Sequence, residues 1–193
     1  MANIGLRNAK YNQIDYETNK YKALVDSKVP VLGKMIDAKL TENRSDASLF
    51  ADDGLAEYDN SFTGGSIALT LADVDDDTYA EVKGCTISNS ELTENEEDSS
   101  PEIGYGHIIT KMVNGVKKYK VEFLPRIIVT KITADAKTKG ESIEFNTVSL
   151  EGKVMALNKA INGLQVGDWH KVKTFDTLAA AVTYLDGLLT PVA

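Results

Sequence analysis

Alternation of apolar and polar residues is the clearest pattern along the chain, and it predicts strands. Within residues 106–123, Tyr119 and Val121 alternate with lysines, which is typical of a strand with one buried and one solvated face. Asn114 and Gly115, just before, can take the positive φ angles of a two-residue hairpin turn. We therefore expect this segment to form a β-hairpin.

Shorter apolar runs with many β-branched residues predict further strands. These runs lie at residues 13–25, 28–40, 66–71, 126–133 and 141–157. In the last run the apolar positions shift from Ile143 and Phe145 to Val148 and Leu150. Such a change of parity predicts a β-bulge or bend near Asn146.

The end of the chain has the pattern of a helix. Apolar residues recur at helical spacing from Leu178 to Leu185, and Pro191 lies beyond them. Thr174 is a suitable N-cap, which would place Asp176 in the first turn. Many strands with one short and one longer helix predict a mainly β fold. We expect an antiparallel β-sandwich or barrel with one or two flanking α-helices, as a single domain over residues 1–193.

An aspartate cluster precedes the short helix and raises the question of a calcium loop. Asp73, Asp75 and Asp77 would fill the first, third and fifth ligand positions of an EF-hand. Thr78 stands where that loop needs glycine, and Gly84 stands where it needs a bidentate glutamate. The aspartates are better interpreted as the start of a helix that Gly84 ends, with no metal bound.

Two segments do not show the periodicity of a strand or a helix. Residues 41–62 are polar and turn-prone, yet they carry the large apolar side chains of Leu49, Phe50, Leu55, Tyr58 and Phe62. We expect a long loop that docks on a neighbouring molecule through these five residues, or folds back on its own core. Residues 88–102 are acidic and lack aromatic residues, so they are expected to form a solvated, mobile loop.

Composition and charge restrict the function classes. The chain has 193 residues, 42% of them hydrophobic, and a formal net charge of −8, which disfavours general affinity for nucleic acid or anionic membranes. Cys85 is the only cysteine, so an internal disulfide or a cysteine zinc cluster is not expected. No apolar run is long enough for a membrane span or a signal peptide, so folding in a cytoplasm is expected.

Few residues offer catalytic chemistry. His107 and His170 are the only histidines, and neither belongs to a nucleophile, zinc or triad motif. Gly104 and Gly106 begin like a dinucleotide fingerprint, but the third glycine is absent and the stretch predicts a strand. The sequence therefore predicts a protein that is not an enzyme and that needs no cofactor.

Four stretches taken together resemble one family. They are "LFADDGLAEYDNSFTGGSIALTLADVDDD" (49–77), "EIGYGHIITKMVNGVKKYKVEFLP" (102–125), "KTKGESIEFNTVSLEGKVMAL" (137–157) and "WHKVKTFDTLAAAVTYL" (169–185). In this order they are similar to the major tail proteins of bacteriophages with long non-contractile tails. The likeness runs from about residue 5 to about residue 189, and the ordered set is more specific than any single stretch.

The resemblance implies a structural protein of the virion. Family members form hexameric rings whose strands join into a continuous inner barrel, and the rings stack into a tube through which genomic DNA passes without specific binding. It also implies contacts with tail tip, tape measure and tail terminator proteins, and assembly in the bacterial host cytoplasm. The chain lacks the added C-terminal immunoglobulin-like domain of some relatives, so a smooth tube is expected.

Three other functions stay open on sequence grounds. The inner tube of a contractile tail or of a bacteriocin would use the same fold. A β-sandwich that binds a ligand or glycan would be a monomer with a concave site. A metal-dependent hydrolase would use the cluster from Asp73 to Asp77 and would bind divalent metal tightly.

Overall fold

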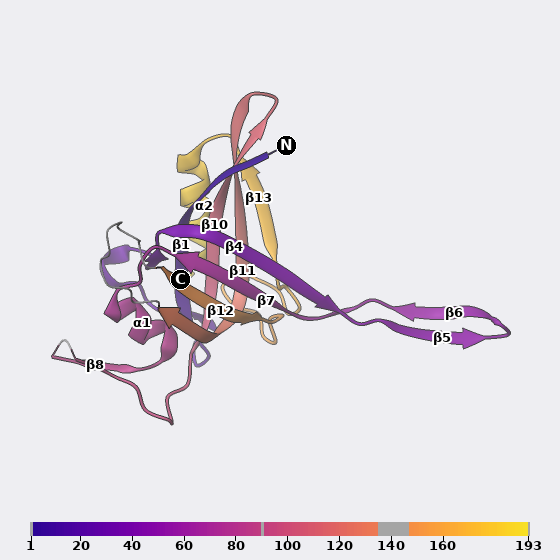
Figure 1. Ribbon diagram of the computed structural model, residues 1–193, viewed down its shortest axis with the longest axis horizontal. Helices are drawn as coiled ribbons and strands as arrows, with labels where there is room; N and C mark the ends of the chain where they lie inside the picture. Colours follow the sequence, from indigo (N-terminus) through magenta and orange to yellow (C-terminus); the bar gives the residue numbers. More distant parts are fainter. Residues whose placement is uncertain (1, 90, 135–146, 193) are drawn as a thin grey trace, which may run out of the picture.

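The computed structural model describes residues 2–89, 91–134 and 147–192, and antiparallel strands make up most of it (Figure 1). Its strands are β1 (Ala2–Asp15), β2 (Lys20–Tyr21), β3 (Val31–Gly33), β4 (Met35–Arg44), β5 (Ala47–Ala51), β6 (Gly54–Asp59), β7 (Phe62–Leu71), β8 (Thr86–Ser88), β9 (Glu91–Thr93), β10 (Glu102–Val113), β11 (Val116–Ala134), β12 (Val148–Val154) and β13 (Lys171–Phe175). Its helices are α1 (Asp76–Lys83), α2 (Leu178–Leu189) and a short 3₁₀ turn at Val25–Ser27. The prediction of a mainly β fold with flanking helices is confirmed.

One antiparallel sheet organises the body of the protein. Its strands follow the order β2-β1-β10-β11-β12-β7-β4, while β3 also pairs with β1 and β13 also pairs with β11. The long hairpin β10–β11 turns at Asn114 and Gly115, which have φ angles of 50° and 79°. The hairpin predicted from the alternation of residues is therefore confirmed. The predicted bulge near Asn146, with Ile143 and Phe145, lies outside the described residues.

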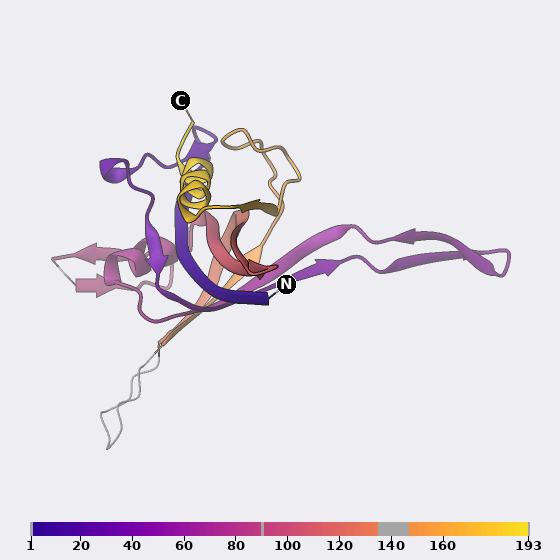
Figure 2. The same ribbon diagram turned by 90° about the horizontal axis from the view of Figure 1, so that it is seen from above.

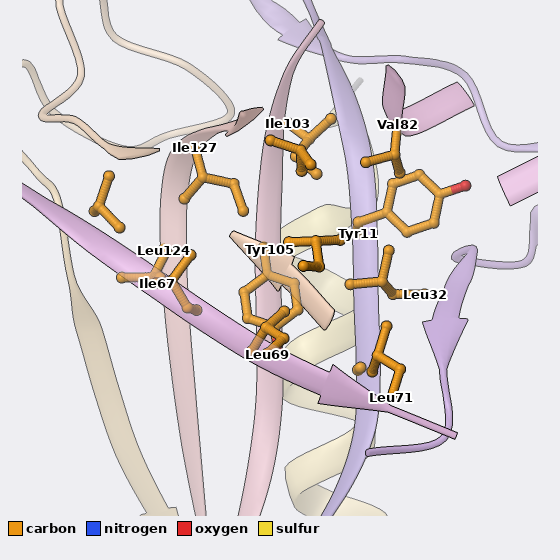
Figure 3. Close-up of a cluster of buried hydrophobic side chains, with 14 residues drawn as sticks. Tyr11, Leu32, Ile67, Leu69, Leu71, Val82, Ile103, Tyr105, Leu124 and Ile127 are labelled. Atoms are coloured by element: carbon orange, nitrogen blue, oxygen red, sulfur yellow. The ribbon is translucent and has the colours of Figure 1, made fainter. Parts of the chain in front are cut away.

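The sheet curls around a first hydrophobic core. Leu69 of β7 and Tyr105 of β10 belong to one buried cluster although their strands are not neighbours in the sheet (Figure 3). Leu32 of β3 and Val82 of α1 close the same cluster. Since side chains from both halves of the sheet meet here, the sheet encloses its own apolar face as a sandwich does.

Helix α2 covers the other face of β10 and β11 and forms a second core. Leu185 and Ala181 of α2 pack with Ile108 of β10 and Val121 of β11. The helix lies so close to the sheet that a Cβ on Gly106 would stand 2.4 Å from a Leu185 methyl carbon. Strand β10 is consequently buried on both faces from Ile103 to Thr110, as expected for the central strand of a layered domain.

Strand β11 serves both cores because its register shifts within the strand. Ile103 pairs with Ile127, but Tyr105 pairs with Leu124, so β11 carries an extra residue between these two pairs. Alternate residues that face the second core before the shift, such as Phe123, are therefore followed by Ile127, which faces the first core beyond it. Pro125 lies at this irregularity, where its missing N–H group does not interrupt the regular ladder.

Helix α1 confirms the interpretation of the aspartate cluster as a helix start. The Asp75 carboxylate caps the helix by accepting a hydrogen bond from the backbone N–H of Thr78 at 2.7 Å. Gly84 ends the helix with φ 78°, and a Cβ there would stand 2.2 Å from the Ser99 carbonyl oxygen. Both the cap and the stop therefore follow the residue types that the sequence presents.

Helix α2 begins later than the sequence predicted. Its N-cap is Thr177, whose hydroxyl accepts a hydrogen bond from the N–H of Ala180, and Asp176 precedes the helix. Thr174 instead lies in β13, where it pairs with Lys120. The assignment of Thr174 as N-cap was wrong because strand pairing with β11 extends the chain through Phe175.

The acidic segment 88–102 is not a loop throughout. Residues 91–93 pair with 86–88 as the small ribbon β8–β9, which lies beside α1 at the left of Figure 1. The side chains from Glu94 to Ser99 are exposed, in agreement with a solvated segment. Its mobility stays a prediction.

The cap of α1 can be tested by two substitutions at one position. Asp75→Ala is expected to lower the free energy of unfolding by about 1 kcal/mol, because it removes the acceptor for the Thr78 N–H. Asp75→Asn keeps a capping oxygen and is expected to cost much less. Urea unfolding followed by circular dichroism measures both, and equal losses in the two variants would contradict a capping role.

Candidate assembly surface

A two-stranded ribbon leaves the body and is the most conspicuous feature of the surface. Strands β4 and β7 pair from Met35 and Leu71 as far as Arg44 and Phe62, and β5–β6 continues the same ribbon beyond them. It extends along the longest axis, at the opposite end from α1 (Figures 1 and 2). With about 3.4 Å per residue, the tip at Asp52 lies about 24 Å beyond Ser45. We call residues 45–61 the protruding hairpin.

The protruding hairpin corrects the prediction of an irregular loop at residues 41–62. Ala47–Ala51 pair with Gly54–Asp59, and the tip turns at Asp52 and Asp53, whose φ angles are 50° and 61°. Positive φ at both central residues gives the turn that matches the twist of a hairpin, and aspartate tolerates this conformation better than most residues. The segment lacks strand periodicity because neither of its faces packs on the body, so no alternation of apolar and polar residues is required.

Four of the five predicted interface residues are exposed on this hairpin. The exposed fractions are 57% for Leu49, 70% for Phe50, 58% for Leu55 and 54% for Tyr58. Phe50 lies directly opposite Leu55, and Ser48 lies opposite Tyr58. Since Ser48 and Phe50 share a face, Phe50, Leu55 and Tyr58 lie together on one face of the ribbon, and Leu49 lies on the other.

Phe62, the fifth predicted interface residue, belongs to the base of the hairpin. Its ring stacks on Trp169 with the ring centroids 4.2 Å apart and the planes 11° from parallel. The Ser45 N–H donates to the Ser61 carbonyl at 2.8 Å, and the Arg44 guanidinium donates to the Asn60 carbonyl at 3.2 Å. Phe62 therefore contributes to the anchor of the ribbon rather than to its exposed part.

The hairpin carries a strong negative charge. Residues 45–61 contain five acidic residues and no basic residue: Asp46, Asp52, Asp53, Glu57 and Asp59. The Asp46 carboxylate raises the pKa of the Tyr58 phenol, so Tyr58 stays neutral. The hairpin thus combines exposed large apolar side chains with an acidic outline.

The outer face of β4, β7 and β12 is covered by small polar and charged residues. Three rows cross these strands: Asp37–Thr70–Ser149, Lys39–Ala68–Glu151 and Thr41–Ser66–Lys153. Inward-facing residues of the same strands, such as Ile67, Leu69 and Leu150, are fully buried. Apart from β7, no strand in the described part of the chain pairs with β4, so the outer edge of β4 has no backbone ladder, although β1 comes near part of it.

A polar cluster lies on the paired strands β10 and β11 and includes His107 and Glu122. His107 of β10 is 3% exposed, and its Nε2 lies 3.7 Å from a Glu122 carboxylate oxygen. Burial lowers the pKa of His107 to about 4, against a smaller opposite effect of Glu122, so the imidazole is neutral at pH 7. Burial alone would raise the pKa of Glu122, but the hydrogen bond from Lys120 and the nearby imidazole outweigh this effect, so the pKa lies below its ordinary value.

The other candidate residues do not converge on a site. His170 is half-buried beside Trp169, with ring centroids 5.1 Å apart, and burial lowers its pKa. Cys85 is only partly buried, and burial raises the pKa of its thiol above the ordinary value. Across the ranges that the structure describes, no group of three or more histidine, cysteine or acidic side chains could hold a metal ion. The absence of calcium binding at Asp73, Asp75 and Asp77 stays a prediction.

Sequence reasoning missed two features that set the shape of this surface. Trp169 anchors the hairpin through Phe62, which lies more than a hundred positions earlier, and no local pattern links the two. The turn at Asp52 and Asp53 did have a local signal, because acidic residues followed by Gly54 between apolar residues favour a hairpin. That signal would have replaced the predicted loop by a ribbon.

The buried imidazole of His107 gives the protein a distinct acid sensitivity. Its pKa of about 4 lies below the value near 6.5 of an unfolded histidine, so between these pH values the unfolded chain binds more protons. The free energy of unfolding should therefore fall by roughly 3 kcal/mol as the pH drops from 6.5 to 4. Urea titrations between pH 7 and pH 5 stay largely above the range in which Glu122 is protonated.

His107→Gln is expected to lose most of this pH dependence, because a neutral amide replaces the imidazole. His170→Gln is the matched control and should change the slope less, since His170 is only half-buried. An unchanged slope in His107→Gln would contradict this assignment.

Comparisons with known proteins leave the family open. No family model matches the chain, and a search of curated proteins found no match. No helix in the described ranges is long and apolar enough to cross a membrane.

Proposed function

We propose that copies of this chain assemble into hexameric rings that stack as the tail tube of a long-tailed bacteriophage. The observation that carries the proposal is the protruding hairpin, with Phe50, Leu55 and Tyr58 exposed on one face. An isolated two-stranded ribbon is at best marginally stable in water, and exposed apolar groups on it gain by contact with another surface. A second copy of the chain supplies that surface in every ring and stack.

The open edge of β4 supports the same proposal. An unpaired strand edge exposes backbone N–H and C=O groups that can pair with another strand. A ring in which the β4 edge pairs with a neighbouring copy extends the sheet from copy to copy and removes the exposed edge. The ordered resemblance of residues 49–185 to major tail proteins agrees with this arrangement.

The outer face of β4, β7 and β12 is the surface that we assign to the lumen. Most of its side chains are polar or charged, which suits a wall past which DNA must slide, while Ile36 of β4 is a large apolar side chain that is 54% exposed. The negative charges of Asp37 and Glu151 balance the positive charges of Lys39 and Lys153 on this face. Lys131, which pairs with Glu151 on β11, adds one positive charge to the described part of the face. The lining is thus close to neutral. A tube that does not retain DNA is expected to have a neutral or negative lining, and this face carries one lysine more than that expectation allows.

The proposal also assigns partners and location. The chain would meet a tail tip protein, a tail terminator and a tape measure protein, would assemble in the bacterial host cytoplasm and would end in the virion tail. It would need no cofactor and would carry out no catalysis.

Assembly can be tested with a variant of the hairpin. Phe50→Ser combined with Leu55→Ser removes two opposed apolar side chains that are 70% and 58% exposed. We expect an unchanged urea midpoint, because neither residue packs in a core, and a loss of the rings or tubes that electron microscopy shows for the wild type at high concentration.

The control removes exposed apolar side chains elsewhere. Val25→Ser combined with Val166→Ser changes two exposed valines that lie outside the hairpin. This control should assemble like the wild type. Unfolding of the hairpin variant, or assembly equal to that of the wild type, would argue against the proposal.

A further inference from the structure

The outer edge of β13 is an unpaired strand edge on the body of the protein. Strand β13 pairs with residues 119–123 of β11, and no other strand in the described part of the chain pairs with it. The backbone hydrogen bonds that the described residues form outside the strand ladders do not involve residues 171–175. Residues 171–174 are also exposed. The edge therefore presents backbone N–H and C=O groups to which a further strand can pair.

Charged and apolar residues alternate along β13. Lys173 lies opposite Val121, which belongs to the core beneath α2, so Lys173 and Lys171 lie on the α2 side of the sheet. Val172 lies opposite Glu122 on the other side, and its side chain is 45% exposed. The edge thus carries two positive charges on one side and an apolar group on the other.

The two lysines of β13 are not neutralised within the described part of the chain. None of its ion pairs involves Lys171 or Lys173. The Nζ atom of Lys173 lies 5.2 Å from the centre of the Phe175 ring and 4.8 Å from that of the Tyr184 ring, and these contacts hold the ammonium group without removing its charge. Two positive charges on a short edge deter a strand of similar charge and attract an acidic one.

Strand β6 of the protruding hairpin has the matching alternation. Glu57 and Asp59 lie on one face of the ribbon, and Tyr58, which is 54% exposed, lies on the other. In the described part of the chain β6 pairs only with β5, so its outer edge is unpaired as well. Two acidic β6 edges repel each other, which disfavours pairing between hairpins and favours a basic receiving edge.

One register satisfies both sides of the joined sheet. In an antiparallel ladder with Tyr58 of one copy opposite Val172 of another, the two acidic neighbours of Tyr58 fall opposite the two lysines that flank Val172. A slip by one residue would place a carboxylate opposite Val172 and would lose the charge pairs. The three pairs of this register are Tyr58–Val172, Glu57–Lys173 and Asp59–Lys171.

Other unpaired edges match β6 less well. Along the outer edge of β4, charges of both signs are mixed, as Asp37, Lys39 and Glu42 show, and β1 comes near part of this edge. The part of β1 from residue 2 to residue 8 that pairs only with β10 carries a single charge, Arg7. Among the described strands, β13 is therefore the edge whose charge and alternation fit β6 best.

The hairpin points away from β13 of its own copy. The stacking of Phe62 on Trp169 fixes its base, and β5–β6 lead away from the body along the longest axis (Figures 1 and 2). Strand β13 lies on the body, paired with β11 and in contact with α2. A partner for the hairpin at this edge is consequently another copy of the chain.

We propose that β6 of one copy adds to the outer edge of β13 of another copy as an antiparallel strand, with Tyr58 on Val172. This inference rests on the proposed function, because it names the receiving edge for the same hairpin. Phe50 shares the face of Tyr58, so it lies on the same side of the joined sheet as Val172. The contact joins two different surfaces, so it is heterologous and propagates from copy to copy as rings or stacks require.

Cysteine cross-linking between two variants tests the contact. Tyr58→Cys and Val172→Cys are made separately in a Cys85→Ser background, which removes the native thiol. Residues directly opposite in an antiparallel ladder have Cβ atoms about 4.5–5.5 Å apart, close to the separation that a disulfide needs. We expect oxidised glutathione to link position 58 to position 172 in a mixture that has formed particles, as identified by peptide mass spectrometry. Such a link joins two copies, because each variant carries only one of the two cysteines.

The matched control replaces the receiving position. Val166→Cys, mixed with Tyr58→Cys in the same background, places the thiol at an exposed valine outside β13, and it should not link. If particles form but positions 58 and 172 link no faster than this control, β13 is not the receiving edge while the proposed function stands. If the wild type forms no particles at any concentration, the proposed function fails as well.

Charge exchange tests the register without removing Tyr58. Glu57→Lys and Lys173→Glu each place like charges opposite one another, so each should weaken self-association about tenfold or more in sedimentation velocity at low salt. The variant with both changes should regain association. Glu57→Lys combined with Lys171→Glu should not, because Lys171 lies opposite Asp59 in the antiparallel register. Rescue by Lys171→Glu instead, or by neither change, would overturn the proposed ladder.

Discussion

The protruding hairpin has no apolar layer of its own to pack against, and the rest of the account depends on this constraint. Two strands form a ribbon with two faces, and both faces of residues 47–59 are exposed. Backbone pairing satisfies the hydrogen bonds between the strands, but the exposed apolar groups of Phe50 and Leu55 remain in water. A second molecule that covered these groups would stabilise the ribbon, which is why we propose a role in assembly for it.

The body of the protein is built to hold such a ribbon firmly. Strands β4 and β7 are held in the curled sheet, where Leu69 and Leu71 are buried in the first core, and they extend out of it as a ribbon that β5 and β6 continue. The stacked rings of Phe62 and Trp169 fix the ladder where it leaves the body. Helix α2 stiffens the opposite face through Leu185, which requires the close approach that Gly106 permits. The two cores thus give a rigid support, and the exposed apolar residues are concentrated at a distance from it.

The parts of the fold that could be predicted are those in which local pattern and packing agree. The hairpin β10–β11 and the start of α1 follow from Asn114-Gly115 and from Asp75, since turn and cap chemistry act over a few residues. Thr174 was misassigned because pairing with β11 overrode its preference for a cap. The protruding hairpin was taken for a loop because its exposed strands need no alternation of apolar and polar residues. The stacking of Phe62 on Trp169 is a long-range contact, and single-sequence patterns do not contain it.

Amide hydrogen exchange of the hairpin, measured at rising protein concentration, tests the central claim most directly. Only the pairing between the two strands protects the backbone amides of residues 45–61 from solvent. These amides should therefore exchange fast in the dilute monomer. We expect their exchange to slow markedly as particles form. Particles in which residues 45–61 exchange as fast as in the monomer, or a chain that stays monomeric with unchanged exchange at every concentration, would contradict it.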